Sequence, residues 1–84
     1  MFRKPDELLE LIKKNHQGNS LNLENQQLTD LDILIIDRYC FDNHITQINL
    51  SKNYFSDRIA KLYSGRLVVS AGIHYDFSHN NDSG

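Results

Sequence analysis

The sequence feature that most constrains the fold of this chain is an internal repeat with a period of 27 residues. A shift by that distance aligns residues of the same class in many columns, and it does so twice in succession. Chains with periods of about 20 to 50 residues build repeat architectures, in which each unit completes the core of its neighbour. The best-matched columns are Leu21, Ile48 and Tyr75; Leu23, Leu50 and Phe77; Asn22, Asn49 and Asp76; and Gln26, Asn53 and Asn80.

Each repeat opens with a short segment in which apolar and polar residues alternate. A period of two predicts a strand with one buried face. The amide column (Gln26, Asn53 and Asn80) follows where the strand must bend. An amide side chain there can bond the backbone of its own turn and of the neighbouring unit. The amide column therefore predicts a hydrogen-bonded contact between successive units.

A helix is predicted after each of the first two strands. Thr29 and Ser56 are suited to be N-caps, and Asp32 completes a variant of the capping box with Thr29. Gly65 is expected to end the second helix. The buried stripes are expected to be Leu31, Ile35, Ile36 and Tyr39 in the first unit, and Ile59, Leu62 and Tyr63 in the second.

Residues 5–15 have the pattern of a separate amphipathic helix. Pro5 suits the first helical position, and the acidic and basic residues lie at the ends that the helix dipole favours. Residues 15–19, around Gly18, end this helix. We expect it to cover the first strand, because the ends of a repeat array must be capped. Its apolar side consists of Leu8, Leu9, Leu11 and Ile12.

The second unit carries a family resemblance. Ile45-x-x-Ile48-x-Leu50-x-x-Asn53-x-Phe55 is similar to the leucine-rich repeat signature, L-x-x-L-x-L-x-x-N-x-L. The first copy departs from it with Gly18 and Gln26, and the third, which starts at Gly72, stops just after Asn80. The Leu-Thr-Asp and Phe-Ser-Asp endings resemble the helix-bearing, ribonuclease-inhibitor-like subtype.

This resemblance implies the fold class and the domain organisation. The fold would be α/β: a short right-handed solenoid with parallel strands on the concave side and helices on the convex side. Residues 1–17 would form the N-terminal capping helix and residues 18–84 the repeats, divided into 18–44, 45–71 and a partial unit 72–84. Because the third unit is unfinished and leaves Tyr75 and Phe77 poorly covered, we expect self-association or a longer array.

In leucine-rich repeat proteins, the strand side chains that point away from the core form the usual partner-binding face. The resemblance therefore implies a protein–protein interaction module without catalysis. The alternatives are an inhibitor that occludes an enzyme's active site and a self-assembly module that pairs, as a homo-oligomer or by domain swapping, through the C-terminal edge. The expected partner-binding residues are Asn22, Glu24, Asn25, Gln47, Asn49, Ser51, Lys52, His74, Asp76 and His79, with Ser20 and Ser78 on the same face.

Catalysis, metal binding and cofactors are not expected. His74, Asp76 and Ser78 share a strand face, but a flat strand offers neither a pocket nor oxyanion donors. Cys40 and His44 have the spacing of a metal pair on a helix. Because no second pair accompanies them, Cys40 is expected to fill the core instead.

Composition narrows the remaining function classes. The 84 residues suffice for one domain, and a net charge of −2 gives no basic field for nucleic acid. No apolar run approaches the ~18 residues of a membrane span, and no secretory leader is recognisable. With a single cysteine, we expect a cytoplasmic protein. Its irregular repeats resemble those of effectors of intracellular bacterial pathogens, so a leaderless secretion into a host cell is the alternative.

Overall fold

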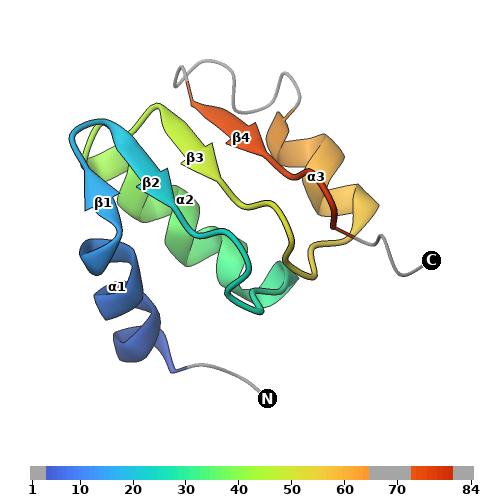
Figure 1. Cartoon of the computed structure of the whole chain (residues 1–84), viewed down its shortest axis with the longest axis horizontal. Coiled ribbons are helices and arrows are strands. Elements are labelled where there is room, and N and C mark those ends of the chain that lie inside the picture. Colours follow the sequence, from blue (N-terminus) through green and yellow to red (C-terminus); the bar gives the residue numbers. More distant parts are fainter. Residues whose placement is uncertain (1–3, 65–72, 81–84) are drawn as a thin grey trace.

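The computed structural model describes residues 4–64 and 73–80 of the chain, and Figure 1 shows their arrangement. The fold is α/β, as the sequence predicts. The residues that would extend the third unit, and the predicted helix end at Gly65, lie outside the described part. The elements in chain order are α1 (Pro5–Lys14), β1 (His16–Gln17), β2 (Ser20–Asn22), the 3-10 turn η1 (Asp30–Asp32), α2 (Ile33–Asp42), β3 (Gln47–Asn49), α3 (Asp57–Ser64) and β4 (His74–Asp76).

The described strands form one sheet in the order β1-β2-β3-β4. β2, β3 and β4 are parallel, and Leu21 lies opposite Ile48, which lies opposite Tyr75. The offset between these partners is the same 27 residues that the sequence repeat shows. The alignment of the repeat units is therefore also the register of the sheet.

The expectation of a wholly parallel sheet is wrong at β1. This strand pairs antiparallel with β2, with His16 opposite Leu21. The hairpin between them turns at Gly18, whose φ of 58° is left-handed and suits glycine. His16 also ties the hairpin to α2, because its Nδ1 lies 3.0 Å from the Tyr39 hydroxyl oxygen. The segment that was expected only to end the first helix thus adds a strand.

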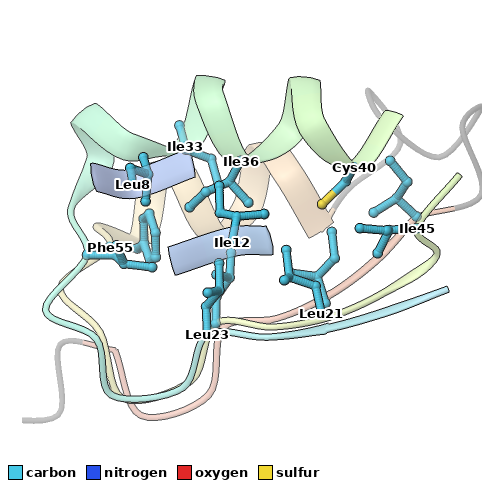
Figure 2. Close-up of a cluster of buried hydrophobic side chains, with 13 residues drawn as sticks. Leu8, Ile12, Leu21, Leu23, Ile33, Ile36, Cys40, Ile45 and Phe55 are labelled. Atoms are coloured by element: carbon cyan, nitrogen blue, oxygen red, sulfur yellow. The ribbon is translucent and has the colours of Figure 1, made fainter. Parts of the chain in front are cut away.

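The hydrophobic core lies between one face of the sheet and the helices (Figure 2). α1 lies beside β1 at one end of the sheet (Figure 1) and buries Leu8 and Ile12 completely. Burying a leucine or isoleucine side chain stabilises the fold by about 1.5–3 kcal/mol. This position of α1 agrees with the predicted role of the N-terminal helix in covering the first unit.

The predicted buried face of α2 is partly wrong. Leu31 is exposed, whereas Ile33, Ile36 and Cys40 are the buried residues of this helix. The cause is the start of the helix: a 3-10 turn precedes it, and the α-helix begins only at Ile33. Since the two helix types advance by different angles per residue, the apolar stripe does not continue from Leu31. On α3, the predicted Leu62 is also exposed.

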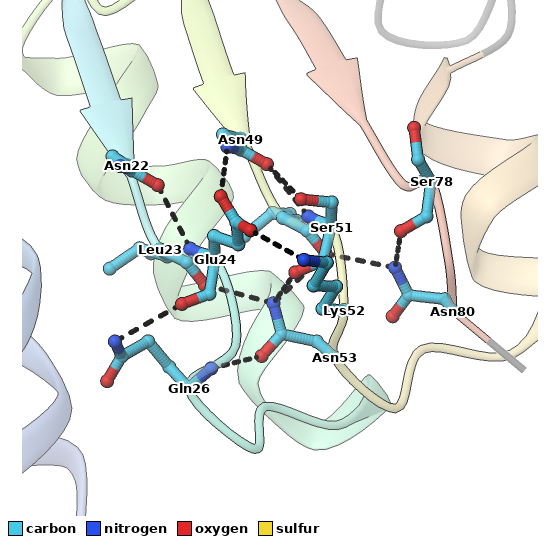
Figure 3. A network of polar contacts seen from close by, with 11 residues as sticks. Asn22, Leu23, Glu24, Gln26, Asn49, Ser51, Lys52, Asn53, Ser78 and Asn80 are labelled. Atoms are coloured by element: carbon cyan, nitrogen blue, oxygen red, sulfur yellow. Dashed lines mark hydrogen bonds and ion pairs between the residues drawn. The ribbon is translucent and has the colours of Figure 1, made fainter. Parts of the chain in front are cut away.

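Asn53 forms the hydrogen-bonded contact between units that the sequence predicts (Figure 3). Its Oδ1 accepts bonds from the amides of Gln26, at 2.9 Å, and Leu28, at 3.0 Å. Its Nδ2 donates to the carbonyl of Leu23 at 2.9 Å and to two carbonyls of its own turn. The side chain is only 2% exposed, so all of these bonds are shielded from water.

Asn80 repeats this contact one unit later. Its Oδ1 accepts from the amide of Phe55 at 2.9 Å, and its Nδ2 donates to the carbonyl of Leu50 at 2.9 Å. Gln26, the residue of the first unit in this column, donates to the carbonyl of Glu24 within its own turn. The amide column thus joins the first unit to the second and the second to the third.

The turns that lead into the helices add further contacts of the predicted kind. The amide of Thr29 donates to the Asp32 carboxylate at 2.9 Å, and the amide of Ile59 donates to the Ser56 hydroxyl at 3.3 Å. The amide of Ser56 donates in turn to the carboxylate of Asp30 at 2.8 Å. The N-cap of α3 is therefore bonded to the turn of the preceding unit.

Aromatic side chains cover the core at the β4 end of the sheet. Phe77 meets Phe55 edge to face and stacks on Tyr75, with ring centroids 5.4 and 5.5 Å apart. The Tyr75 hydroxyl donates to the carboxylate of Asp37, and burial together with this bond raises the pKa of Tyr75. Tyr75 and Phe77 are both half-buried, so the expected weak cover at this end takes the form of partial exposure.

Replacing Asn53 with alanine should lower the free energy of unfolding by about 3 kcal/mol, because several buried backbone groups lose their partner. Chemical denaturation followed by circular dichroism measures this loss. Asn43→Ala is the matched control, since the Asn43 amide bonds the carbonyl of Tyr39 on the exposed end of α2. Equal losses in both variants would contradict the role given to Asn53.

Candidate functional site

The candidate site is the face of the sheet that the helices leave open. Ser20, Gln47 and His74 begin three neighbouring parallel strands and lie opposite one another. All three are exposed, and their side chains make no hydrogen bond within the described residues. With neighbouring strands about 4.8 Å apart, they form a regular polar row across the sheet.

A hollow of about 460 Å³ extends over this face. It runs from the end of α1 across all of the described strands. Lys14 contributes a positive charge on the α1 side, and Asp76 a negative charge on the β4 side. The other lining residues are Asn15, Gln17, Ser20, Leu21, Asn22, Gln47, Ile48, Asn49, His74 and Tyr75.

The column of Asn22, Asn49 and Asp76, which was expected to bind a partner, also holds the turns. A side-chain oxygen of each accepts a hydrogen bond from the backbone amide two residues later, at 3.1, 3.0 and 2.9 Å respectively. These are Asx turns, the local bond by which Asn and Asp redirect a chain. The recurrence of Asn or Asp at each strand end was the sequence signal for this role, and the sequence interpretation missed it.

Three residues predicted to bind a partner are instead joined to one another across units. Lys52 Nζ lies 3.4 Å from a carboxylate oxygen of Glu24, and Asn49 Nδ2 donates to the other oxygen at 3.3 Å (Figure 3). A partly exposed ion pair of this kind stabilises by at most about 1 kcal/mol. These side chains remain at the surface, and a partner would meet them as one connected group.

Ser51 does not lie on the accessible face. It is buried, and its hydroxyl donates to Oδ1 of Asn49 at 2.6 Å. The prediction that Ser51 contacts a partner is therefore wrong. Strand alternation placed it on the open face, but β3 ends at Asn49 and the chain turns inward there.

The last three predicted residues share one backbone conformation. Asn25, Lys52 and His79 occupy equivalent positions and have φ angles of 56°, 59° and 60°. This left-handed conformation is uncommon outside glycine, although asparagine tolerates it well. The repeat therefore reproduces its turn geometry as well as its strands.

Asp76 is ionised at neutral pH. The hydroxyl and the backbone amide of Ser78 both donate to it, and with the nearby His79 they lower the pKa of this carboxyl group. The Ser78 hydroxyl is thus directed at Asp76. This bond does not have the arrangement of an activated nucleophile, in which serine bonds a basic histidine.

The cysteine pattern considered for metal binding is not assembled into a site. Cys40 is fully buried in the core, whereas His44 is exposed. Burial and the charge of Asp37 raise the pKa of the Cys40 thiol to about 12. Within residues 4–64 and 73–80, no three His, Cys, Asp or Glu side chains converge as a metal site requires.

Comparisons with known proteins found no matching family model, no matching curated protein and no matching solved structure. The described helices include none that is both long and apolar enough to cross a membrane.

Replacing Ser78 with alanine should raise the pKa of Asp76 toward its usual value of about 3.8. Since the folded-state pKa is lowered, the stabilisation from the Ser78 hydroxyl should be present at neutral pH and lost as pH falls through that pKa. NMR titration of the Asp76 side chain measures the shift, with Ser20→Ala as the control. An unchanged Asp76 pKa in Ser78→Ala would contradict this assignment.

The Cys40 thiol should be inert to Ellman's reagent in the native protein at neutral pH and should react fully once guanidinium unfolds it. Only the thiolate attacks the reagent, and burial keeps this group protonated. Ser20→Cys places a thiol on the open face and should react within minutes. Equal rates at both positions in the native protein would refute the burial of Cys40.

Proposed function

We propose that this chain is a protein-binding module of the leucine-rich-repeat kind, which recognises its partner through the open face of the sheet and does so without catalysis. The row of Ser20, Gln47 and His74 carries this proposal. The side chains that surround it hold turns or bond one another, whereas these three are exposed and unbonded within the described residues. Such groups are available to a partner at no cost to the fold.

Two observations support the repeat class. The parallel strands pair with the offset of the sequence repeat, and the amide column bonds each unit to the one before it. A solenoid with its strands on the concave side would produce both. In that architecture the row would lie along the inner surface.

The chemistry of the face indicates the kind of partner. Serine, glutamine and histidine offer hydrogen bonds, and Lys14 and Asp76 add one charge of each sign at opposite ends of the hollow. Strongly basic or acidic partners are not favoured by such a surface. We therefore propose a polar, mixed-charge protein surface as the partner, and an enzyme held in an inhibited state would be one example.

Self-assembly through the β4 end is the second candidate. β4 is the last strand of the described sheet, and Tyr75 and Phe77 beside it are only half-buried. A strand edge with apolar neighbours can pair with another chain. This candidate predicts a contact with a second copy at β4, whereas the main proposal predicts a different protein at the row.

A photo-crosslinking amino acid at Gln47 should capture the partner, because this position lies in the middle of the row. The same amino acid at Tyr54, which is exposed in the turn after β3, is the matched control. The experiment is performed in cells that produce the protein, and mass spectrometry identifies the adduct.

An adduct with one other protein from position 47, and none from position 54, is the expected result. It should disappear when His74 is replaced with glutamate, because a new negative charge then interrupts the row. A product of twice the 9.8 kDa chain mass would favour self-assembly. Equal labelling from both positions would refute the open face as the binding surface.

A further inference from the structure

The outer side of α2 carries large apolar residues that its fold does not use. Leu31, Leu34 and Phe41 are 66%, 70% and 63% exposed. Ile33, Ile36 and Cys40 of the same helix point into the core on the opposite side (Figure 2). The spacing of Leu31, Leu34, Arg38 and Phe41 is three, four and three residues, which places them in one line along the helix. We call these four residues the α2 stripe.

The repeat itself provides the comparison that shows this stripe to be unusual. A shift of 27 residues takes Leu31 to Arg58 and Leu34 to Lys61, both exposed on α3. The same positions of the repeat are therefore charged in the second unit and apolar in the first. The fold has no need of leucine there, because the second unit forms its helix without it. Exposed apolar patches of this kind mark interaction sites.

We propose that the α2 stripe is a dimer contact, in which α2 packs antiparallel against α2 of a second copy of this chain. The three-four-three spacing is that of the seam in a helix pair. With a two-fold axis near Ile36, each Leu31 lies opposite Phe41 of the second copy, and each Leu34 lies opposite Arg38. Every member of the stripe then has a partner from the same stripe.

The charge on the stripe selects this orientation. A parallel pair would place Arg38 opposite its own copy, and like charges in contact are unfavourable. In the antiparallel pair, the aliphatic stem of Arg38 covers a leucine. Its guanidinium stays in water with Asp42, whose carboxylate lies 3.3 Å from Arg38 Nε. The stripe is thus complementary to itself in one direction only.

A groove beside the stripe extends the contact. Leu9 of α1 and Leu34, Ile35 and Tyr39 of α2 line a mostly apolar hollow of about 330 Å³. This surface lies on the helix side of the molecule, away from the open face of the sheet. Dimerisation here and partner binding at Gln47 are therefore independent, and either can fail alone.

The first test is the oligomeric state of the full chain by sedimentation equilibrium at rising concentration. The wild type should form dimers, and Leu34→Lys, which copies the residue of the second unit, should raise the dimer dissociation constant by about 100-fold. Leu31→Arg copies Arg58 and should act in the same way. Tyr54→Gln removes an exposed aromatic outside the stripe and should have no effect. A wild type that stays monomeric, or a dimer that both stripe variants leave intact, would overturn the proposal.

The second test is the orientation. Leu34→Cys and Arg38→Cys variants are mixed under mild oxidation, with Cys40 buried and protonated in both. The antiparallel pair should give mainly the mixed disulfide between positions 34 and 38. A prevalence of disulfides between two copies of position 34 would contradict the antiparallel arrangement. Circular dichroism confirms that each variant keeps its fold.

Discussion

The rest of this structure depends on the side-chain amide of Asn53. Two neighbouring turns bring backbone amides and carbonyls together in a place that water does not reach, and an unpaired buried group of this kind costs about 1–3 kcal/mol. One asparagine satisfies groups in both turns, because its amide carries a donor and an acceptor at once. The second unit can therefore pack against the first only in the register that presents Asn53 to the turn after Leu23. Asn80 imposes the same condition on the third unit.

This constraint decides which side chains of the open face are available for function. The turns must be held in place for the amide column to meet its partners, and Asn22, Asn49 and Asp76 hold them through Asx bonds. Ser51 is drawn inward by the same turn. What remains at the start of the strands is the row of Ser20, Gln47 and His74, where no structural demand acts on the side chains. The candidate site thus lies at the opposite end of the strands from the contacts that build the repeat.

Much of the fold could be predicted because a sequence repeat and a strand register are the same quantity when units stack one residue against its equivalent. For that reason Leu21, Ile48 and Tyr75 were correctly aligned, and the bonding of Asn53 followed from its place at the bend. β1 could not be predicted, because two residues are too few to show alternation. The exposure of Leu31 depends on whether a helix starts with a 3-10 or an α turn, which capping residues do not determine. The site was predicted less well than the fold, since the same Asn or Asp can face a partner or bond its own backbone.

The central claim is that the Asn53 side chain, and no backbone group, holds the turn of the preceding unit. Amide hydrogen exchange at Gln26 and Leu28 tests it most directly, because these two amides lie in a turn and donate to Asn53 Oδ1. They should be protected as strongly as the amide of Leu50, which bonds the backbone of Asp76, and that protection should be lost in Asn53→Ala. Exchange of Gln26 and Leu28 at the rate of an unstructured peptide in the wild-type protein would contradict the account.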